Sequence, residues 1–537
     1  MKRIFSHPLM LLPMTLAIGV PGFTLAQTGA SAFSPAQSTP AQTEAPVETN
    51  QAFGQKPPNW QITPSIAIDG TFTDNVNLAA HNRQSDFITR ISPGIRIEGQ
   101  SGRASGNLNY QWQQYVYADT SARNNQQKSL AANGRLELVE QWLFLDASHN
   151  TSQQAVSAFG TQGVGNELIN SNRTEVSSYR LSPYIQGRLA SVADYQLRYS
   201  GTHTSSDSGA LSGGTAATTQ AWNGQLSGVT PLTYLSWAFN VDNLDIDHSS
   251  GFKSQNDRMY GTLIYLIVPQ VRLSVSAGSE SDNYLAGVER KKGTTGIGVE
   301  WAPTERTKVA LRKDRRSFGD SFSADFTHRT ALSAWKFSDS RSVRVPSADL
   351  ALAPRGTFYD LFYDLFASIS NPADRATAAQ QAATIYTGGS PNSLIPSALT
   401  SQAYIERRQM ASFALTGVNN TVTFALDRSN SQRIGAGIGL GLGDDFALSP
   451  EIRQTGFNTN WAYKMTPNEV LTLTALTSRS VGSGNLETTL KSVSLRLSTK
   501  LGAQTSASAG LRQTRFDNSN GNDYDEQALT GAVLFKF

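Results

Sequence analysis

Cysteine is absent from the 537 residues, which excludes a disulfide framework and thiolate metal sites. After the N-terminus, no run of 18 apolar residues occurs, so we expect no transmembrane helix in the mature chain. The chain also has little excess charge, because 45 basic and 42 acidic residues leave a net charge of +3. This near balance gives no global attraction to nucleic acid, and we expect no nucleic-acid partner.

Recognisable catalytic and metal-binding patterns are also lacking. The six histidines are scattered, one of them in the first ten residues, and no HExxH spacing occurs. No arrangement of Ser, His and Asp indicates a catalytic triad. We therefore expect no enzyme activity, no metal and no cofactor.

The N-terminus has the pattern of a signal peptide. Lys2 and Arg3 supply the positive start, residues 9–20 are largely apolar, and Thr24 and Ala26 offer small residues before a cleavage site. We predict a signal peptide over residues 1–26, since the apolar run is short for an uncleaved anchor helix. Residues 27–58 are rich in Ala, Gln, Thr, Ser and Pro, which predicts a disordered periplasmic tail.

From residue 59 to 537 the pattern is a repeated alternation of polarity. In 235–241 and 271–277, the odd positions are apolar and the even positions are mostly small or polar. A period of two places each set on one face of a β-strand. The segments run to about ten residues or more, which is the length a tilted strand needs to cross a bilayer. Arg and Gln in mid-segment suit a wet lumen.

The connections alternate in length. Tight links recur at 229–232, 268–270, 302–305, 418–420 and 465–468, and longer polar stretches lie at 152–173, 205–216, 247–255, 282–292, 347–403 and 517–525. Short turns on the periplasmic side and long loops outside are typical of outer-membrane barrels. With both termini on the short-turn side, the strand number must be even. We predict an all-β fold, a large transmembrane antiparallel β-barrel of about 22 strands in the cell outer membrane.

Two segments depart from the alternation. Residues 435–443 alternate Gly with other residues and could form a strand or part of a loop. The long loop insertion at 347–403 loses the period of two, and residues 358–366 and 372–383 are predicted to form short helices. This insertion could be a constriction inside the barrel or a cap outside it.

The last strand carries a terminal signature. Counting back from the end, alternate residues share one face, and the chain stops on an aromatic residue. This resembles the strand signal that the barrel assembly machinery reads in outer-membrane proteins, and it predicts that machinery as a partner. The residues are Leu529, Gly531, Val533, Phe535 and Phe537.

Strand parity also predicts which charged and aromatic residues face the pore or the interface. Inward arginines would favour anionic solutes if they formed rings, or would stiffen the wall if paired with acids such as Glu98, Asp242 and Asp427. The lumen candidates are Arg96, Arg198, Arg272, Arg312, Arg496 and Arg512. Trp60, Tyr115, Tyr117, Trp142, Trp301 and Tyr463 are predicted interfacial aromatics. We expect outer-membrane lipid and lipopolysaccharide as partners, the latter through the basic stretches 290–292 and 315–316.

The first part of the repeat resembles a known family. The stretches Thr73-Asp-Asn-Val76, 85–88, 92–98, 108–117 and 136–146 together resemble the PEP-CTERM-system-associated outer-membrane β-barrel proteins, which occur with exopolysaccharide gene clusters. The resemblance is clearest over residues 59–150 and implies a barrel that passes, or helps to pass, a secreted polysaccharide. It supplies no catalytic residues.

The sequence therefore favours an outer-membrane channel for exopolysaccharide export, with the lumen arginines and the 347–403 insertion as its working parts. Polysaccharide and periplasmic export components would then be partners. A porin for passive uptake of small solutes is the alternative. A barrel that only anchors structural or adhesive surface loops is the second alternative.

Overall fold

The computed structural model describes residues 59–190, 192–206, 216–249, 253–284, 289–345, 363, 400, 403–435 and 444–537. The predicted signal peptide and periplasmic tail lie outside the described residues. So does nearly all of the 347–403 insertion, including its two predicted helices except for residue 363, which is helical.

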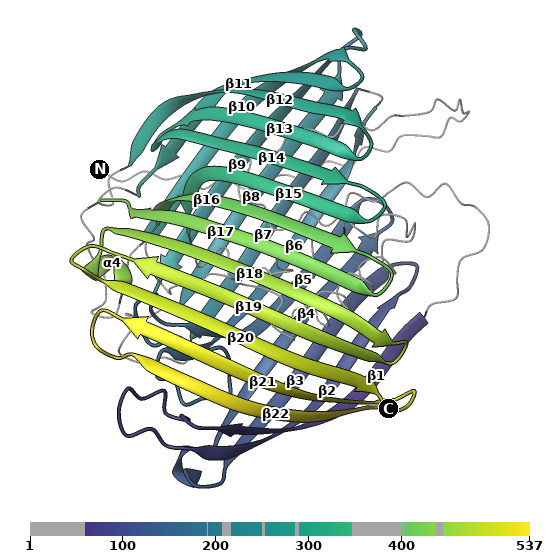
Figure 1. Cartoon of the computed structure of the whole chain (residues 1–537). Helices are drawn as coiled ribbons and strands as arrows, with labels where there is room; N and C mark the ends of the chain where they lie inside the picture. The colour runs from purple at the N-terminus through teal and green to yellow at the C-terminus, as the bar shows by residue number, and fades with distance from the viewer. Residues whose placement is uncertain are drawn as a thin grey trace. The chain divides into compact units, whose positions relative to one another are not determined.

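The described chain forms one 22-stranded antiparallel sheet (Figure 1). The strands are β1 (Asn59–Thr73), β2 (Asp86–Gln100), β3 (Ala104–Tyr117), β4 (Asn125–Val139), β5 (Leu143–Ala155), β6 (Arg173–Leu189), β7 (Ala193–Ser206), β8 (Ala217–Val229), β9 (Leu235–His248), β10 (Lys253–Val268), β11 (Val271–Asp282), β12 (Arg290–Thr304), β13 (Thr307–Arg316), β14 (Gly319–Arg329), β15 (Ser333–Arg344), β16 (Tyr404–Thr416), β17 (Asn420–Arg433), β18 (Glu451–Thr466), β19 (Glu469–Val481), β20 (Glu487–Lys500), β21 (Thr505–Asn518) and β22 (Tyr524–Lys536).

The sheet closes on itself. Each strand pairs with the next along the chain, and β1 pairs with β22 from Ser65 opposite Lys536 to Thr73 opposite Ala528. Closure leaves no free edge on which another chain could add a strand. The predicted barrel class and strand number are confirmed.

The two faces of the wall differ as the alternation predicted. Leu263 on β10, Val275 on β11 and Ile297 on β12 point outward with 57%, 60% and 65% of their surfaces exposed. The intervening Thr262 and Ser274 point inward and are buried. An apolar outer surface that continues from strand to strand is suited to lipid hydrocarbon, and a polar inner wall is suited to water.

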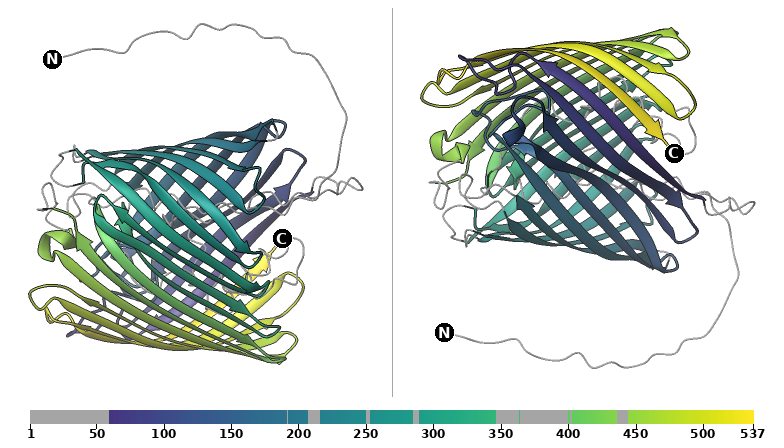
Figure 2. Two further views of the ribbon diagram at one scale, coloured as in Figure 1. Left: turned by 90° about the horizontal axis from the view of Figure 1, so that it is seen from above. Right: turned by 90° about the horizontal axis from the view of Figure 1, so that it is seen from below.

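The turns show the predicted alternation in connection length. All five predicted tight links lie at one end of the barrel, where the connections between strands are two to five residues long. β1 begins and β22 ends at this same end (Figure 2). All six predicted long stretches connect strands at the opposite end. By the usual rule for outer-membrane barrels, we expect the short-turn end to be periplasmic.

Helical structure is slight among the described residues. η1 (Ser121–Arg123) follows β3, and α4 (Asp445–Leu448) precedes β18. None of the described helices is long and apolar enough to cross a membrane. Residues 436–443 lie outside the described residues, but β17 pairs directly with β18, so no strand stands between them.

The predicted aromatic girdle is correct in part. Trp60, Trp142 and Trp301 are outward and 44–47% exposed near strand ends. Tyr115 and Tyr117 are at most 1% exposed and face the interior, so their predicted interfacial role is wrong. The reason is parity, because they share the inward face of β3 with buried Gln113 rather than the outward face with Val116.

Candidate functional site in the barrel lumen

The six arginines predicted to line the lumen all lie on inward-facing strand positions. They lie on different strands and at different heights of the wall, so they do not form a single ring. Arg272, for example, is the second residue of β11 at the periplasmic end, whereas Arg512 lies midway along β21.

Five of these arginines form ion pairs, which supports the pairing alternative for them. The pairs are Arg96–Glu98 (2.8 Å), Arg198–Asp146 (2.8 Å), Arg272–Glu300 (3.6 Å), Arg312–Asp314 (2.7 Å), and Arg512 with both Glu167 and Glu526 (2.8 Å each). Arg496 forms no ion pair with the described residues.

The acids expected as partners behave differently from one another. Glu98 pairs with Arg96 as predicted. Asp427 pairs instead with Arg408, which parity had not singled out. Asp242 accepts a hydrogen bond from the Asn223 amide (3.0 Å) and has no arginine within ion-pair distance among the described residues. Pairing along a strand is therefore easier to predict than pairing across strands.

The connection between β5 and β6, residues 156–172, folds into the lumen; we call it the inner loop. It begins against α4, which lies in the connection between β17 and β18. The Ala158 N–H donates to Asp445 Oδ2 (2.7 Å), and Ser157 Oγ donates to Asp445 Oδ1 (2.5 Å). Asp445 is 1% exposed in the structure, and this burial raises the pKa of its carboxyl to about 6.

The inner loop then bonds to inward-facing side chains of the wall. Thr488 Oγ1 on β20 donates to the Ala158 carbonyl (3.0 Å), and Asn518 Nδ2 on β21 donates to the Phe159 carbonyl (3.2 Å). The Tyr524 hydroxyl on β22 donates to the Gln162 carbonyl. These bonds satisfy carbonyl groups that are cut off from bulk water.

The distal part of the inner loop is held by Glu167. Its carbonyl accepts from the Tyr117 hydroxyl (2.7 Å), and its carboxylate pairs with Arg512 (2.8 Å). Burial alone would raise the pKa of Glu167, but the Arg512 guanidinium holds it below its ordinary value. The buried Tyr117, which was expected at the lipid interface, thus serves to anchor this loop.

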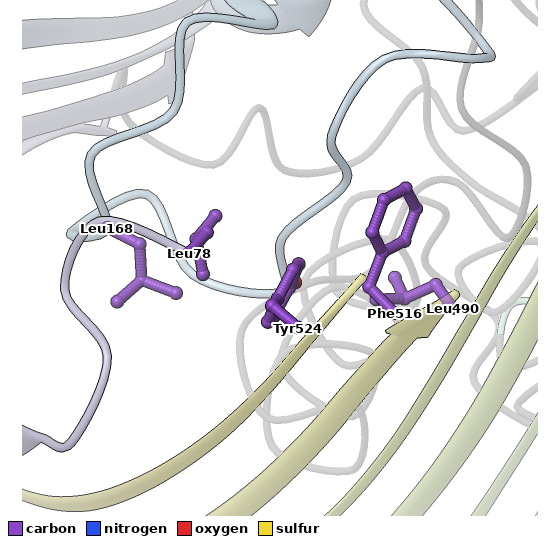
Figure 3. Close-up of a cluster of buried hydrophobic side chains, with 5 residues drawn as sticks. All are labelled: Leu78, Leu168, Leu490, Phe516 and Tyr524. Atoms are coloured by element: carbon purple, nitrogen blue, oxygen red, sulfur yellow. The ribbon is translucent and has the colours of Figure 1, made fainter. Parts of the chain in front are cut away.

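Apolar packing fastens the inner loop to the same part of the wall (Figure 3). Leu168 of the inner loop and Leu78 of the β1–β2 connection lie beside Leu490, Phe516 and Tyr524, which project from β20, β21 and β22. All five are at most 7% exposed. The loop is therefore a packed part of the lumen rather than a solvated surface segment.

Sequence reasoning missed the inward course of this loop, because it assigned 152–173 to the outer loops and expected an inward segment only at 347–403. A signal was present. Phe159, Val164, Leu168 and Ile169 give this connection an apolar content that a solvated loop does not need. Of the residues described, none of the His, Asp and Glu side chains gather in threes as a metal site would require.

The basic stretches expected to meet lipopolysaccharide divide between the two faces. Arg290 pairs with Asp282 (3.1 Å), and Arg316 turns inward to Glu280. Lys291 and Arg315 are exposed at outward positions. Contact of these two with lipopolysaccharide stays a prediction.

The terminal strand occupies the seam of the barrel. Leu529 and Phe535 are exposed on its outward face, which Gly531 and Val533 share, and exposed Phe537 follows the strand. β22 pairs with β21 on one side and β1 on the other. Recognition of this strand by the assembly machinery stays a prediction.

The closed sheet, the apolar outside and the polar lumen together define an outer-membrane β-barrel of porin-like type. In agreement, residues 48–163 match the protein-family model described as "Putative beta-barrel porin 2". No curated protein matches the chain.

Solved structures of outer-membrane proteins are similar at low identity. The siderophore receptor PirA from Acinetobacter baumannii is 8% identical, with a TM-score of 0.48 and coverage of 90% of this chain and 81% of that one. The iron transporter FrpB from Neisseria meningitidis is 12% identical (TM-score 0.47; coverage 88% and 81%). OpdK from Pseudomonas aeruginosa, solved with vanillate, is 8% identical (TM-score 0.30; coverage 89% and 99%). Because all three TM-scores are below 0.5, the fold is assigned from the strand pairings of this chain and not from these structures.

Proposed function

We propose that this protein is a passive, water-filled channel for hydrophilic solutes whose bore is set by the inner loop. The observation that carries the proposal is the inner loop itself. It lies inside a polar-walled barrel and is fixed by side chains of β3, β20, β21 and β22. A barrel of 16 to 18 strands already leaves an aqueous channel, so 22 strands leave room for both a folded loop and a solute path.

Solute movement would follow from concentration alone. The inward faces of the strands offer hydroxyl, amide and charged groups that replace water contacts as a solute passes. The fixed loop would exclude solutes by size, because its carbonyl groups and apolar side chains are already bonded or packed and cannot move aside cheaply.

The test is single-channel conductance of the purified full chain in planar bilayers. Replacing residues 158–171 with a short Gly-Ser link should increase conductance and admit larger neutral sugars in a liposome-swelling assay. The matched control replaces η1 (Ser121–Arg123), a connection at the same end with no buried residue, and should change neither. A wild-type barrel that inserts but conducts no ions would overturn the channel and favour a barrel that only anchors loops.

Export of an exopolysaccharide, the function that the sequence favoured, becomes the second candidate. It is favoured by the strand number, which exceeds that of 16- to 18-stranded porins, and by the family resemblance of residues 59–150. The inner loop places it second here, because a fixed constriction suits small solutes better than a polymer. Deleting the gene and measuring secreted polysaccharide separates the two candidates. The predicted gate at 347–403 lies almost wholly outside the described residues, and the expected lack of enzyme activity stays a prediction.

A further inference from the structure

A buried arginine on β10 has no ion-pair partner among the described residues. Arg258 is 3% exposed, and its Nε and Nη1 atoms have no hydrogen-bond acceptor among the described residues. Its guanidinium lies over the Tyr260 ring, 4.1 Å from the centroid. A buried cation with free donors is costly unless something else satisfies it.

Two acids lie beside Arg258 in the sheet, yet both are bonded elsewhere. Asp242 on β9 and Glu280 on β11 are its register partners. Asp242 accepts from the Asn223 amide (3.0 Å). Glu280 accepts from Asn256 Nδ2 (3.0 Å), Arg316 Nε (3.2 Å) and the Ser317 N–H (3.1 Å). The acids thus fix the surroundings of Arg258 without neutralising it by direct contact.

Two further arginines converge on the same place from β13. Arg312 donates Nε to Asp314 Oδ2 (2.7 Å) and Nη2 to Asp314 Oδ1 (3.0 Å), while its Nη1 has no acceptor among the described residues. Together with Ser321 and Ser323 of β14, these groups line a hollow of about 10 Å³ in the lumen wall. We call it the Arg258 pocket. Its lining is Arg258, Arg312, Asp314, Arg316, Ser321, Phe322 and Ser323.

Glycine on the intervening strand makes this convergence possible. Gly296 of β12 faces inward beneath the pocket, and a Cβ there would lie 2.0 Å from Asp314 Oδ1 and 2.5 Å from Ser276 Oγ. Any other residue would obstruct the reach of β13 side chains across β12 to Ser276 on β11, which Arg312 Nη2 contacts at 3.2 Å. The pocket is therefore a built arrangement of five adjacent strands, β10 to β14.

We propose that the Arg258 pocket binds an anionic oxygen of an acidic solute in the lumen, specifically the carboxylate of an acidic sugar or small organic acid. The free donors are guanidinium N–H groups, which bond most strongly to anionic oxygens. The hollow has room for about one oxygen-sized atom, so the rest of the solute stays in the lumen. Arg316 ends β13 at the long-loop end, which places the pocket in the outer half of the barrel.

This proposal rests on the proposed channel for the access of solute, so binding and conductance are measured separately. Equilibrium dialysis of the full chain in detergent uses labelled glucuronate, with glucose as the neutral analogue and sulfate and phosphate as competitors. Wild type should bind glucuronate and not glucose. Arg258→Met should bind about tenfold more weakly or worse, since tenfold corresponds to about 1.4 kcal/mol.

Arg96→Met is the matched control, because Arg96 also faces the lumen but is paired with Glu98 at the periplasmic end. It should leave glucuronate binding unchanged. Arg312→Met is a second pocket variant in case Arg258→Met does not fold. Folding of each is checked by circular dichroism before binding is measured.

The outcomes are separable. No glucuronate binding by wild type, or binding by both pocket variants as tight as that of wild type, overturns the pocket and leaves ordered water as its occupant. Preferred binding of sulfate or phosphate overturns the carboxylate assignment. Binding without ion conductance supports the pocket and overturns the channel, whereas conductance without binding does the reverse.

Discussion

Two buried arginines of the lumen wall, Arg512 on β21 and Arg258 on β10, differ in what surrounds them. Arg512 is saturated: Glu167 of the inner loop and Glu526 of β22 each lie 2.8 Å from it. Arg258 keeps two of its nitrogen atoms without an acceptor among the described residues. Both positions look alike in the sequence, since each is an arginine at an inward position of an alternating strand.

The comparison shows that a buried cation can hold the fold together or remain available to a solute. At Arg512, two acids converge on one guanidinium and tie a loop to the wall. At Arg258, three arginines converge on a hollow of about 10 Å³, which we propose binds a small anionic group. Stability experiments should therefore separate the two regions.

The largest expected effect is loss of the Arg512 anchor. Arg512→Met leaves Glu167 and Glu526 buried without a counter-charge, which should lower the free energy of unfolding by about 3–5 kcal/mol. Arg258→Met should be neutral or stabilising, because it replaces an unsatisfied charge with an apolar side chain of similar length. Urea unfolding in phospholipid vesicles measures both. Equal losses for the two variants would remove the distinction.

Asp445 should make the inner loop dependent on pH. Burial, opposed by the bonds from Ser157 and Ala158 and reinforced by nearby Asp444, raises its pKa from 3.8 to about 6. Because the pKa is raised in the folded state, the protonated carboxyl contributes about 3 kcal/mol to the free energy of unfolding. This contribution is fully present below pH 3.8 and is lost as the pH rises through 6. Asp445→Asn should abolish this dependence.

The measurement is the difference in unfolding free energy between wild type and Asp445→Asn at pH 4, 5, 6 and 7, in which the other titrating groups cancel. The unfolding free energy of wild type should fall steadily relative to that of the variant as the pH rises. A difference that stays constant over this range would contradict the buried carboxylate.

A methyl group at Gly165 should disturb the anchor more than one at Gly163. The new Cβ of Gly165→Ala would lie 2.0 and 2.2 Å from the Glu167 carboxylate oxygens, which Arg512 holds in place. Overpacking of this kind costs about 1–3 kcal/mol. The new Cβ of Gly163→Ala would meet Leu78 Cδ1 at 3.4 Å, Asn170 Nδ2 at 3.7 Å and Leu168 Cδ1 at 4.0 Å, which are ordinary contacts, so this variant should be near neutral. Thermal unfolding of the two variants, side by side, checks the contrast.

The smallest effect is expected from one hydroxyl. Tyr524→Phe removes the donor to the Gln162 carbonyl and should cost about 1 kcal/mol. The matched control is Tyr463→Phe, at an outward position where the hydroxyl makes no hydrogen bond to the described residues. An equal loss of stability in both variants would mean that it comes from removing a tyrosine hydroxyl in general and not from losing the bond to the inner loop.

Most of the wall could be predicted from sequence because a side chain's face depends only on strand parity. The alternation at 235–241 and 271–277 is enough to place Trp237 and Val275 outside and Ser236 and Ser274 inside. By the same rule, all six predicted lumen arginines lie at inward positions of their strands. Strand parity also places Tyr115 and Tyr117 inside, where they are buried. They were assigned to the interface because aromatic residues are common at the ends of barrel strands.

By itself, the sequence determined the closed barrel, the side on which its turns lie and the inward or outward direction of each strand residue, since all of these follow from local periodicity and turn chemistry. Only the tertiary structure decided that residues 156–172 enter the lumen and that Arg512 is neutralised while Arg258 is not. The physical reason is that these outcomes depend on partners hundreds of residues away, such as Asp445 for Ser157 and Glu167 for Arg512. Closure of the sheet, and not any local pattern, brings those partners together.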